Sequence, residues 1–270
     1  QSLPPIRQMV DDTLILVDGS VVRWTQGEAG LEYVPGLDHA RRLARTFDEQ
    51  SDNGHTCVVM ASGRVYCWGT NFTGQLGNGW AGVEHHQALP VAVQRIDNAV
   101  DVAAAGLSTC ALRSDGSVSC WGLVRDSLLT LEPVEITALA PQPIPQVVTH
   151  AEGLRELALG GGMGRLGACG LDSESVLRCW GMTPHRVDEV ANFSRDYHCA
   201  SPTACYGCLV KTNGEVFCAG DNTYGQLGVG VRGEVSTDPV SDLTQVQKVV
   251  TGTNHACALT QAGAVYCWGS

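Results

Sequence analysis

Ten of the twelve cysteines fall into five pairs whose members are ten residues apart. The pairs are Cys57–Cys67, Cys110–Cys120, Cys169–Cys179, Cys208–Cys218 and Cys257–Cys267. Each pair encloses two runs of strand-forming residues around a short turn, as at residues 61–63. In a hairpin centred on that turn the two cysteines are directly opposed, with Cβ atoms about 4.5–5.5 Å apart. The spacing therefore predicts five disulfide-bonded hairpins.

The other two cysteines, Cys199 and Cys205, lie just before the fourth pair. We expect them to bridge one another and to stiffen an inserted loop. This loop carries three candidate binding residues, Tyr197, His198 and Tyr206. A zinc site is the alternative, with ligands from Cys199, Cys205, Cys208 and His198. Because Cys208 already has a partner in Cys218, we favour the disulfide and expect neither a metal nor a cofactor.

A second candidate surface lies in residues 78–87, which place Trp80 close to two adjacent imidazoles, His85 and His86. A tryptophan in a long polar loop is typical of a recognition site, because aromatic side chains dominate binding hot spots. The alternative is that Trp80 only packs over the edge of its own repeat. We expect the loop to bind a partner.

Two histidines occupy equivalent positions, His55 before Cys57 and His255 before Cys257. Together with Asn254 they are further candidate binding residues. An imidazole near a carboxylate can act as a general base, but we expect each ring to bond neighbouring backbone. The other hairpins have Ser108, Gly167 and Gly207 at this position, which excludes a symmetric ring of metal ligands.

The elements that would position these residues form a repeat. A sixth copy of the hairpin, residues 13–23, has Thr13 and Arg23 at the two cysteine positions. An apolar stretch precedes each hairpin and a short Pro-marked strand follows most of them, which is typical of propeller blades. The sequence predicts one all-β domain over residues 1–270, a six-bladed β-propeller with seven blades as the alternative. We expect residues 3–6 to pair with the last hairpin and close the ring.

One repeat contains Asn71, Gly74, Gln75, Leu76 and Gly77 after Cys67-Trp68-Gly69, and residues 219–230 repeat this pattern. The pattern resembles the repeat of the regulator of chromosome condensation family. The resemblance implies a closed β-propeller, most often with seven blades, whose members mainly bind other proteins. The paired cysteines resemble those of secreted bacterial members of that family.

Composition narrows the class of protein. The net charge of −11 argues against nucleic acid as a partner, because phosphate binding needs a basic surface. No apolar stretch approaches the roughly 20 residues of a membrane span, so we expect no membrane insertion. Twelve cysteines indicate an oxidising compartment, and we expect a secreted or periplasmic monomer.

Two functions follow from these features. The first hypothesis is a protein or peptide binder that uses its long-loop face. The alternative is an enzyme at the mouth of the propeller channel, with His55, His198 or His255 acting beside a carboxylate. The sequence has no recognisable catalytic motif, so we consider the protein more a binder than an enzyme.

Overall fold

The structure is a computed structural model that describes residues 5–10, 12–25, 30–46, 54–124, 140–149, 151–160, 167–180, 185–194, 196–201, 204–233 and 238–270. The described residues form an all-β, six-bladed propeller without α-helices. The chain divides into two compact units, Gln1–Gly153 and Leu154–Ser270, which we call unit 1 and unit 2. The expectation of one continuous domain stays a prediction.

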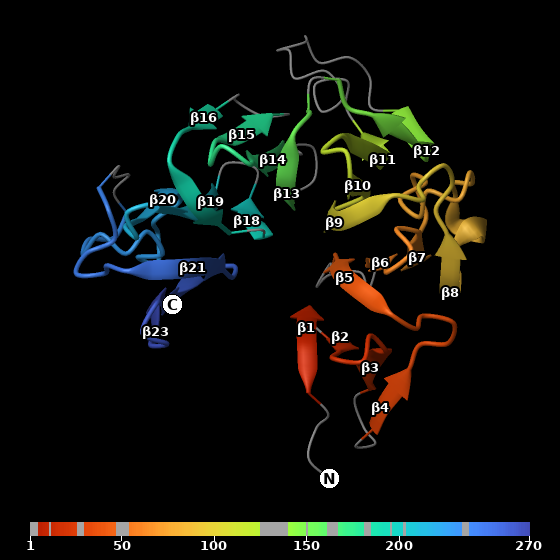
Figure 1. Cartoon of the computed structure of the whole chain (residues 1–270), viewed down its shortest axis with the longest axis horizontal. Coiled ribbons are helices and arrows are strands. Elements are labelled where there is room, and N and C mark those ends of the chain that lie inside the picture. The colour runs from red at the N-terminus through yellow and green to blue at the C-terminus, as the bar shows by residue number, and fades with distance from the viewer. Residues whose placement is uncertain are drawn as a thin grey trace. The chain divides into compact units, whose positions relative to one another are not determined.

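Unit 1 contains three antiparallel sheets of four strands each, which we number blades 1 to 3. Blade 1 comprises β1 (Ile6–Val10), β2 (Thr13–Leu16), β3 (Val21–Thr25) and β4 (Gly30–Tyr33). Blade 2 comprises β5 (Ala40–Arg45), β6 (His55–Met60), β7 (Val65–Gly69) and β8 (Gln87–Ala92). Blade 3 comprises β9 (Ala99–Ala105), β10 (Ser108–Arg113), β11 (Val118–Val124) and β12 (Ala140–Val147). In Figure 1, β5 lies between β1 and β9.

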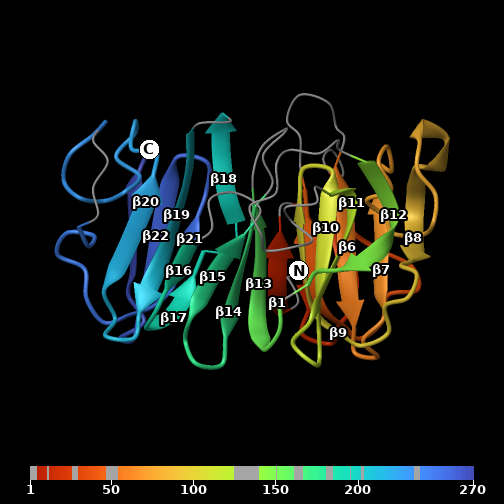
Figure 2. The same ribbon diagram turned by 90° about the horizontal axis from the view of Figure 1, so that it is seen from above.

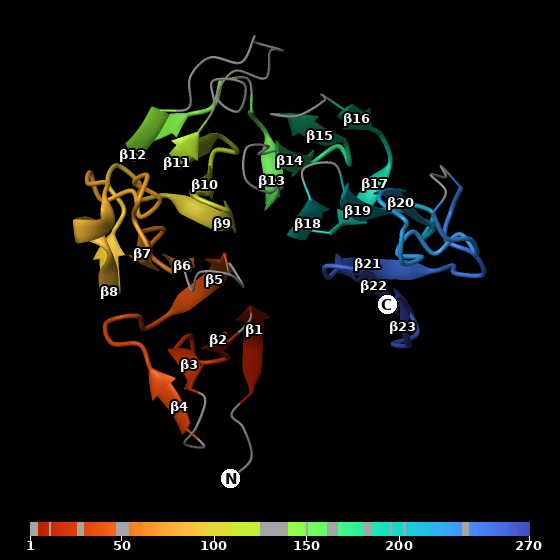
Figure 3. The same cartoon turned by 180° about the vertical axis from the view of Figure 1, so that it is seen from behind.

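Unit 2 contains blades 4 to 6, and a short parallel pairing joins the strands of blades 4 and 5 into one eight-stranded sheet. Blade 4 comprises β13 (Leu154–Gly160), β14 (Gly167–Asp172), β15 (Leu177–Trp180) and β16 (His185–Val187), the first three of which lie side by side in Figure 2. Blade 5 comprises β17 (Val190–Phe193), β18 (Asp196–Ser201), β19 (Ala204–Lys211) and β20 (Val216–Gly220). Blade 6 comprises β21 (Val246–Thr251), β22 (His255–Thr260) and β23 (Val265–Gly269), which follow one another in Figure 3.

The five predicted disulfides are confirmed. In every pair the two cysteines are directly opposed across the hairpin. Their Cα atoms lie 4.0–4.1 Å apart. Thr13 and Arg23 take the same register in blade 1, where they pair without a disulfide. The hairpin is thus one unit of structure that blade 1 builds from different residues.

The hairpin turns depend on a residue in the left-handed backbone region. Gly63 has φ +82°, and a Cβ there would lie 2.5 Å from the carbonyl oxygen of Asp97. Glycine is therefore required for both backbone conformation and space.

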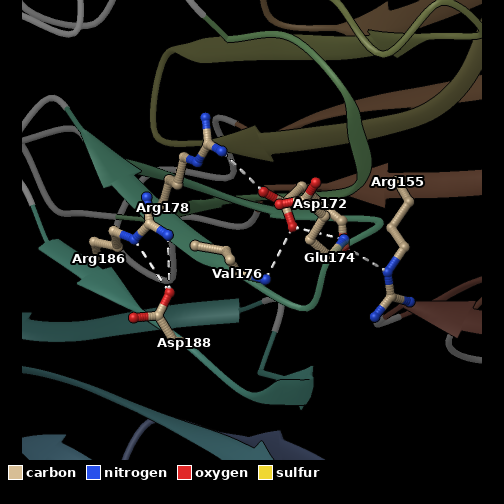
Figure 4. Close-up of polar contacts among 7 residues, drawn as sticks. All are labelled: Arg155, Asp172, Glu174, Val176, Arg178, Arg186 and Asp188. Atoms are coloured by element: carbon tan, nitrogen blue, oxygen red, sulfur yellow. Dashed lines mark hydrogen bonds and ion pairs between the residues drawn. The ribbon is translucent and has the colours of Figure 1, made fainter.

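Blade 4 lacks that glycine and uses Ser175 at φ +66° instead. Its turn is held by the Asp172 carboxylate, which accepts bonds from the backbone N–H groups of Glu174 (3.0 Å) and Val176 (2.9 Å). The Arg178 guanidinium donates to the same carboxylate at 3.0 Å (Figure 4). A buried carboxylate with three donors thus holds a turn that other blades form with glycine.

Unit 1 packs its blades through buried side chains between neighbouring sheets. Ile15, Val21 and Trp68 belong to the cluster between blades 1 and 2. Val59 and Trp121 belong to the cluster between blades 2 and 3. These contacts fix blade 2 from both sides, and so they fix the loop that leaves its third strand.

The Pro-marked strand at Pro90 is confirmed, because Pro90 lies in β8. Pro239 forms only an isolated bridge to Phe217, so the expected strand is reduced there to a single pairing. The expectation that residues 3–6 pair with the last hairpin is wrong for Ile6, which pairs with Leu16 in blade 1. Residues 1–4 lie outside the described residues. Blade 6 accordingly has three strands in the part of the chain that the structure describes.

Candidate binding surface on the loop side of unit 1

The ends of β6 and β7 at His55 and Gly69 define what we call the loop side of unit 1, because the long loop of residues 70–87 leaves from there. The turn side is the opposite end of the same strands. Asn71, fully buried, organises this loop: its Nδ2 donates to the carbonyl oxygen of Trp80 at 3.0 Å. Its Oδ1 accepts the N–H of Leu76 at 3.1 Å. One amide therefore ties the two halves of the loop together.

Gln75 connects the same loop to blade 3. Its Oε1 accepts the N–H of Thr73 at 2.9 Å, and its carbonyl oxygen accepts the indole N–H of Trp121 at 2.8 Å. A Cβ at Gly77 would lie 2.8 Å from that indole nitrogen, so only glycine allows the approach. The repeat residues of this loop are thus a framework, and the residues between them are free to differ.

Trp80 is exposed on this framework, with 61% of its surface accessible. Its ring is tilted by 31° against that of His85, with centroids 5.1 Å apart. His85 ends a short 3-10 helix, Val83–His85, and the ring of His86 meets Phe72 edge-on at 4.5 Å. Trp80 is thus mostly exposed and lies against His85 of its own loop, and its role in binding a partner stays a prediction. The loop presents an aromatic platform on a hydrogen-bonded backbone.

His55 is buried and its ring bonds two side-chain hydroxyls, so the expectation that it bonds neighbouring backbone is wrong. Its ring is buried, with Nδ1 3.0 Å from the Thr46 hydroxyl and Nε2 2.7 Å from the Thr109 hydroxyl. Because the Thr109 hydroxyl donates its proton to a hydrogen bond with the carbonyl oxygen of Gln75, it accepts a hydrogen bond from the Nε2–H of His55. Burial lowers the pKa of His55 to about 3, so the ring is neutral at pH 7. Among the described residues, the partners of this neutral ring are hydroxyls and not carboxylates.

The candidate residues of unit 2 are placed differently. His255 is exposed, although it occupies the position equivalent to His55. Tyr206 was expected on the surface, and this is wrong: its ring is 1% exposed. The Tyr206 hydroxyl contacts the carbonyl oxygens of Gly252 (2.6 Å) and His255. Burial raises the pKa of Tyr206 to about 12, so its hydroxyl stays protonated and serves as a donor.

The rest of the inserted loop is only partly described. Tyr197 and His198 lie in β18, and their side chains are outside the described part of the chain. Cys199 and Cys205 oppose one another in the backbone register of β18 and β19, which is compatible with a disulfide. Their side chains lie outside the described part of the chain, so the bridge itself stays a prediction. Cys208 is bonded to Cys218, which removes it from the zinc alternative. The Asn254 side chain has a buried Oδ1 without a hydrogen-bond partner in the described structure.

A cavity of about 520 Å³ adjoins the loop between blades 1 and 2. It was not predicted from the sequence. Among its lining residues are Asp12, Arg23, Arg45, Trp68, His86 and Gln87. The available signal was Arg23, a charged residue at a position that five other hairpins give to a cysteine. The cavity brings His86 of the aromatic loop together with two arginines.

Comparison with known proteins matches this architecture. Profiles of the Regulator of chromosome condensation (RCC1) repeat match residues 62–112, and residues 204–226 and 246–270. The chain is an RCC1-like repeat propeller. It is 24% identical to the human Regulator of chromosome condensation, over 80% of this chain and 70% of that protein. It is also 30% identical to the human E3 ubiquitin-protein ligase HERC2 over 78% of this chain, yet it spans only 5% of HERC2.

Solved structures share the fold of this RCC1-like propeller. Human WBSCR16 is similar with a TM-score of 0.68 at 18% identity, over 92% of this chain and 69% of that chain. Yeast RCC1 (Prp20), solved bound to Kap60, is similar with a TM-score of 0.67 at 15% identity, over 95% of this chain and 67% of that chain. Within the described residues, no helix has the length and apolar character to cross a membrane.

Proposed function

We propose that this RCC1-like propeller is an extracytoplasmic protein that binds a protein or peptide partner through the loop side of unit 1. The observation that carries the proposal is Trp80, whose ring is 61% exposed on a loop held by buried hydrogen bonds. A rigid aromatic platform loses little entropy when a partner binds. Trp80, His85 and His86 are the proposed contact residues.

Two further apolar side chains are exposed in the segment that carries Trp80. Val83 is 63% exposed in the same loop, and Leu89 is 61% exposed at the start of β8. Exposed apolar side chains that cluster are typical of protein interaction sites. Yeast RCC1 (Prp20), which shares this fold, was solved with the protein Kap60 bound.

The extracytoplasmic location is supported by the five disulfides. Such bridges persist in oxidising compartments and are rare in the cytosol. Mass mapping of non-reduced peptides from protein purified with thiols blocked would test this proposal. Reduced cysteines at Cys57 and Cys67 in the native protein would contradict it.

The binding proposal is tested by capturing partners from the extracellular fraction of the source cells. We expect Trp80→Ala to lose at least tenfold in partner affinity, because removing a central aromatic residue commonly costs about 2 kcal/mol or more. Its melting temperature should stay near that of the wild type, because the ring is exposed. Tyr33→Ala is the matched control, since Tyr33 is 64% exposed on β4. Equal loss in both variants, or none in Trp80→Ala, would contradict the proposal.

A further inference from the structure

Positive charge exceeds negative charge among the described lining residues of the cavity between blades 1 and 2. Arg23 and Arg45 line it together with a single carboxylate among the described lining residues, that of Asp12. Asp12 is already engaged, because its Oδ1 accepts bonds from the Arg45 guanidinium and, at 2.8 Å, from the Thr13 hydroxyl. Arg45 also donates to that hydroxyl at 3.1 Å. One resident carboxylate therefore pairs with one arginine.

No hydrogen bond or ion pair joins Arg23 to a carboxylate of the described residues, although Glu32 of β4 is its cross-strand neighbour. Arg23 lies in β3 opposite Thr13, at the position of a half-cystine in the other hairpins. Its Nε is buried without a hydrogen-bond partner in the described structure. A buried donor left unpaired costs about 1–3 kcal/mol, and more when the group is charged. Such a group in a native protein calls for an explanation, and a bound ligand is one.

From this geometry we infer that the cavity is a binding site for an oxyanion, and that its ligand is a carboxylate presented by the partner. A guanidinium offers its donors in a planar fork that matches a carboxylate. The volume of about 520 Å³ falls in the range of small-ligand sites and exceeds what one small inorganic anion fills. An acidic side chain with its flanking atoms suits both the charge and the size of the cavity.

The site lies beside the aromatic loop, so the inference rests on the proposed function and refines it. His86, Gln87 and Ala88 belong both to the loop end and to the cavity lining. A partner that contacts the loop could therefore place a carboxylate against Arg23. The net charge of −11 repels acidic ligands from the protein as a whole, so any binding of an acidic peptide reports a local site.

The probe for this site is a hexaglutamate peptide, with hexaglutamine as the uncharged control and inorganic phosphate as the free oxyanion. Calorimetric titration of the full chain should show binding of hexaglutamate and none of hexaglutamine. Arg23→Gln should weaken hexaglutamate binding at least tenfold, because a charge-assisted hydrogen bond is lost. Arg64→Gln is the matched control: it removes the same charge from an exposed position on the turn side of blade 2.

Asp12→Asn provides an independent test, because it should change the affinity for hexaglutamate in the opposite direction. It removes the resident carboxylate and leaves the cavity more positive, so hexaglutamate should bind more tightly. Circular dichroism would confirm that each variant is folded. If Arg23→Gln did not fold, the increase in Asp12→Asn would still decide the question. Unchanged binding in both folded variants, or a change in the same direction, would overturn the inference.

The two proposals can fail separately. If Arg23→Gln binds hexaglutamate as the wild type does while Trp80→Ala loses the natural partner, the carboxylate site is wrong and the loop surface stands. If phosphate binds through Arg23 and hexaglutamate does not, the oxyanion site is supported but the partner's carboxylate is rejected as its source. Loss of hexaglutamate binding in Arg23→Gln, with full partner binding in Trp80→Ala, would support the site and overturn the loop surface.

Discussion

Blades 1 and 2 build the same hairpin from residues of opposite character. In blade 2 the opposed pair is Cys57–Cys67, which is covalent and fully buried. In blade 1 the opposed pair is Thr13 and Arg23, in the same register but without a bond between the side chains. In blade 2 the disulfide cross-links the two strands of the hairpin. In blade 1 the position of the second cysteine holds Arg23, which lines a cavity.

The two blades also differ in how they satisfy buried polar groups. His55 in blade 2 is neutral and lies between two hydroxyls. Arg23 in blade 1 is charged, and its buried Nε lacks a partner in the described structure. The hairpin of this repeat therefore forms without its disulfide. The position of the second cysteine can then hold a side chain that is suited to binding, as Arg23 is in blade 1.

The largest effect is expected from removing the disulfide of blade 2. Replacing Cys57 and Cys67 together by alanine should lower the free energy of unfolding by about 3 kcal/mol, because the unfolded chain is no longer cross-linked. For a unit of this size that corresponds to roughly 6–12 °C in melting temperature. Thermal unfolding followed by circular dichroism would measure it. An unchanged melting temperature would contradict this prediction, because it would show that the disulfide does not stabilise blade 2.

The converse change gives blade 1 the missing bridge. Thr13→Cys with Arg23→Cys places two cysteines in the register that the other hairpins use. The oxidised protein should gain about 1–3 kcal/mol, less than a native bridge provides because engineered disulfides strain their surroundings. It should also lose hexaglutamate binding. The gain should disappear in reducing agent, and a protein that is stabilised yet still binds hexaglutamate would break the comparison.

The smallest effect concerns His55 and acidification. Its pKa is about 3 when folded and about 6.5 when unfolded, so below pH 6.5 the unfolded chain binds a proton that the folded chain does not. The free energy of unfolding should therefore fall as the pH drops from 6.5 to 3, by about 2 kcal/mol at pH 5. Urea unfolding at pH 7 and pH 5 would measure this. His55→Gln should reduce the difference between the two values, and an equal difference would contradict the assignment.

Much of this fold follows from the sequence because it depends on local spacing. Two cysteines ten residues apart on either side of a short turn are directly opposed in a β-hairpin, so their spacing predicts both the hairpin and its disulfide. The exposure of Trp80 was also predictable, because an aromatic residue stood in a long polar loop. The sequence does not predict the burial of Tyr206. Its hydroxyl contacts the carbonyl oxygens of Gly252 and His255, which belong to the next blade and are distant in the sequence.

The cavity could not be predicted, for the same physical reason. Asp12 and Arg23 are neighbours within the hairpin of blade 1, but Arg45 joins them only through the packing of blade 2 against blade 1. The sequence did place a charged residue where the repeat expects a cysteine. A charge at a position that is buried in the other repeats is a signal that can be sought in related chains.

The central claim is that the loop side of unit 1 binds the partner. Hydrogen–deuterium exchange of the full chain, with and without the captured partner, tests it most directly. The account predicts slower exchange upon binding in residues 78–88, with unchanged exchange at the turn-side residues 61–64 and 114–117. Slower exchange at those turns with no change in residues 78–88 would contradict it.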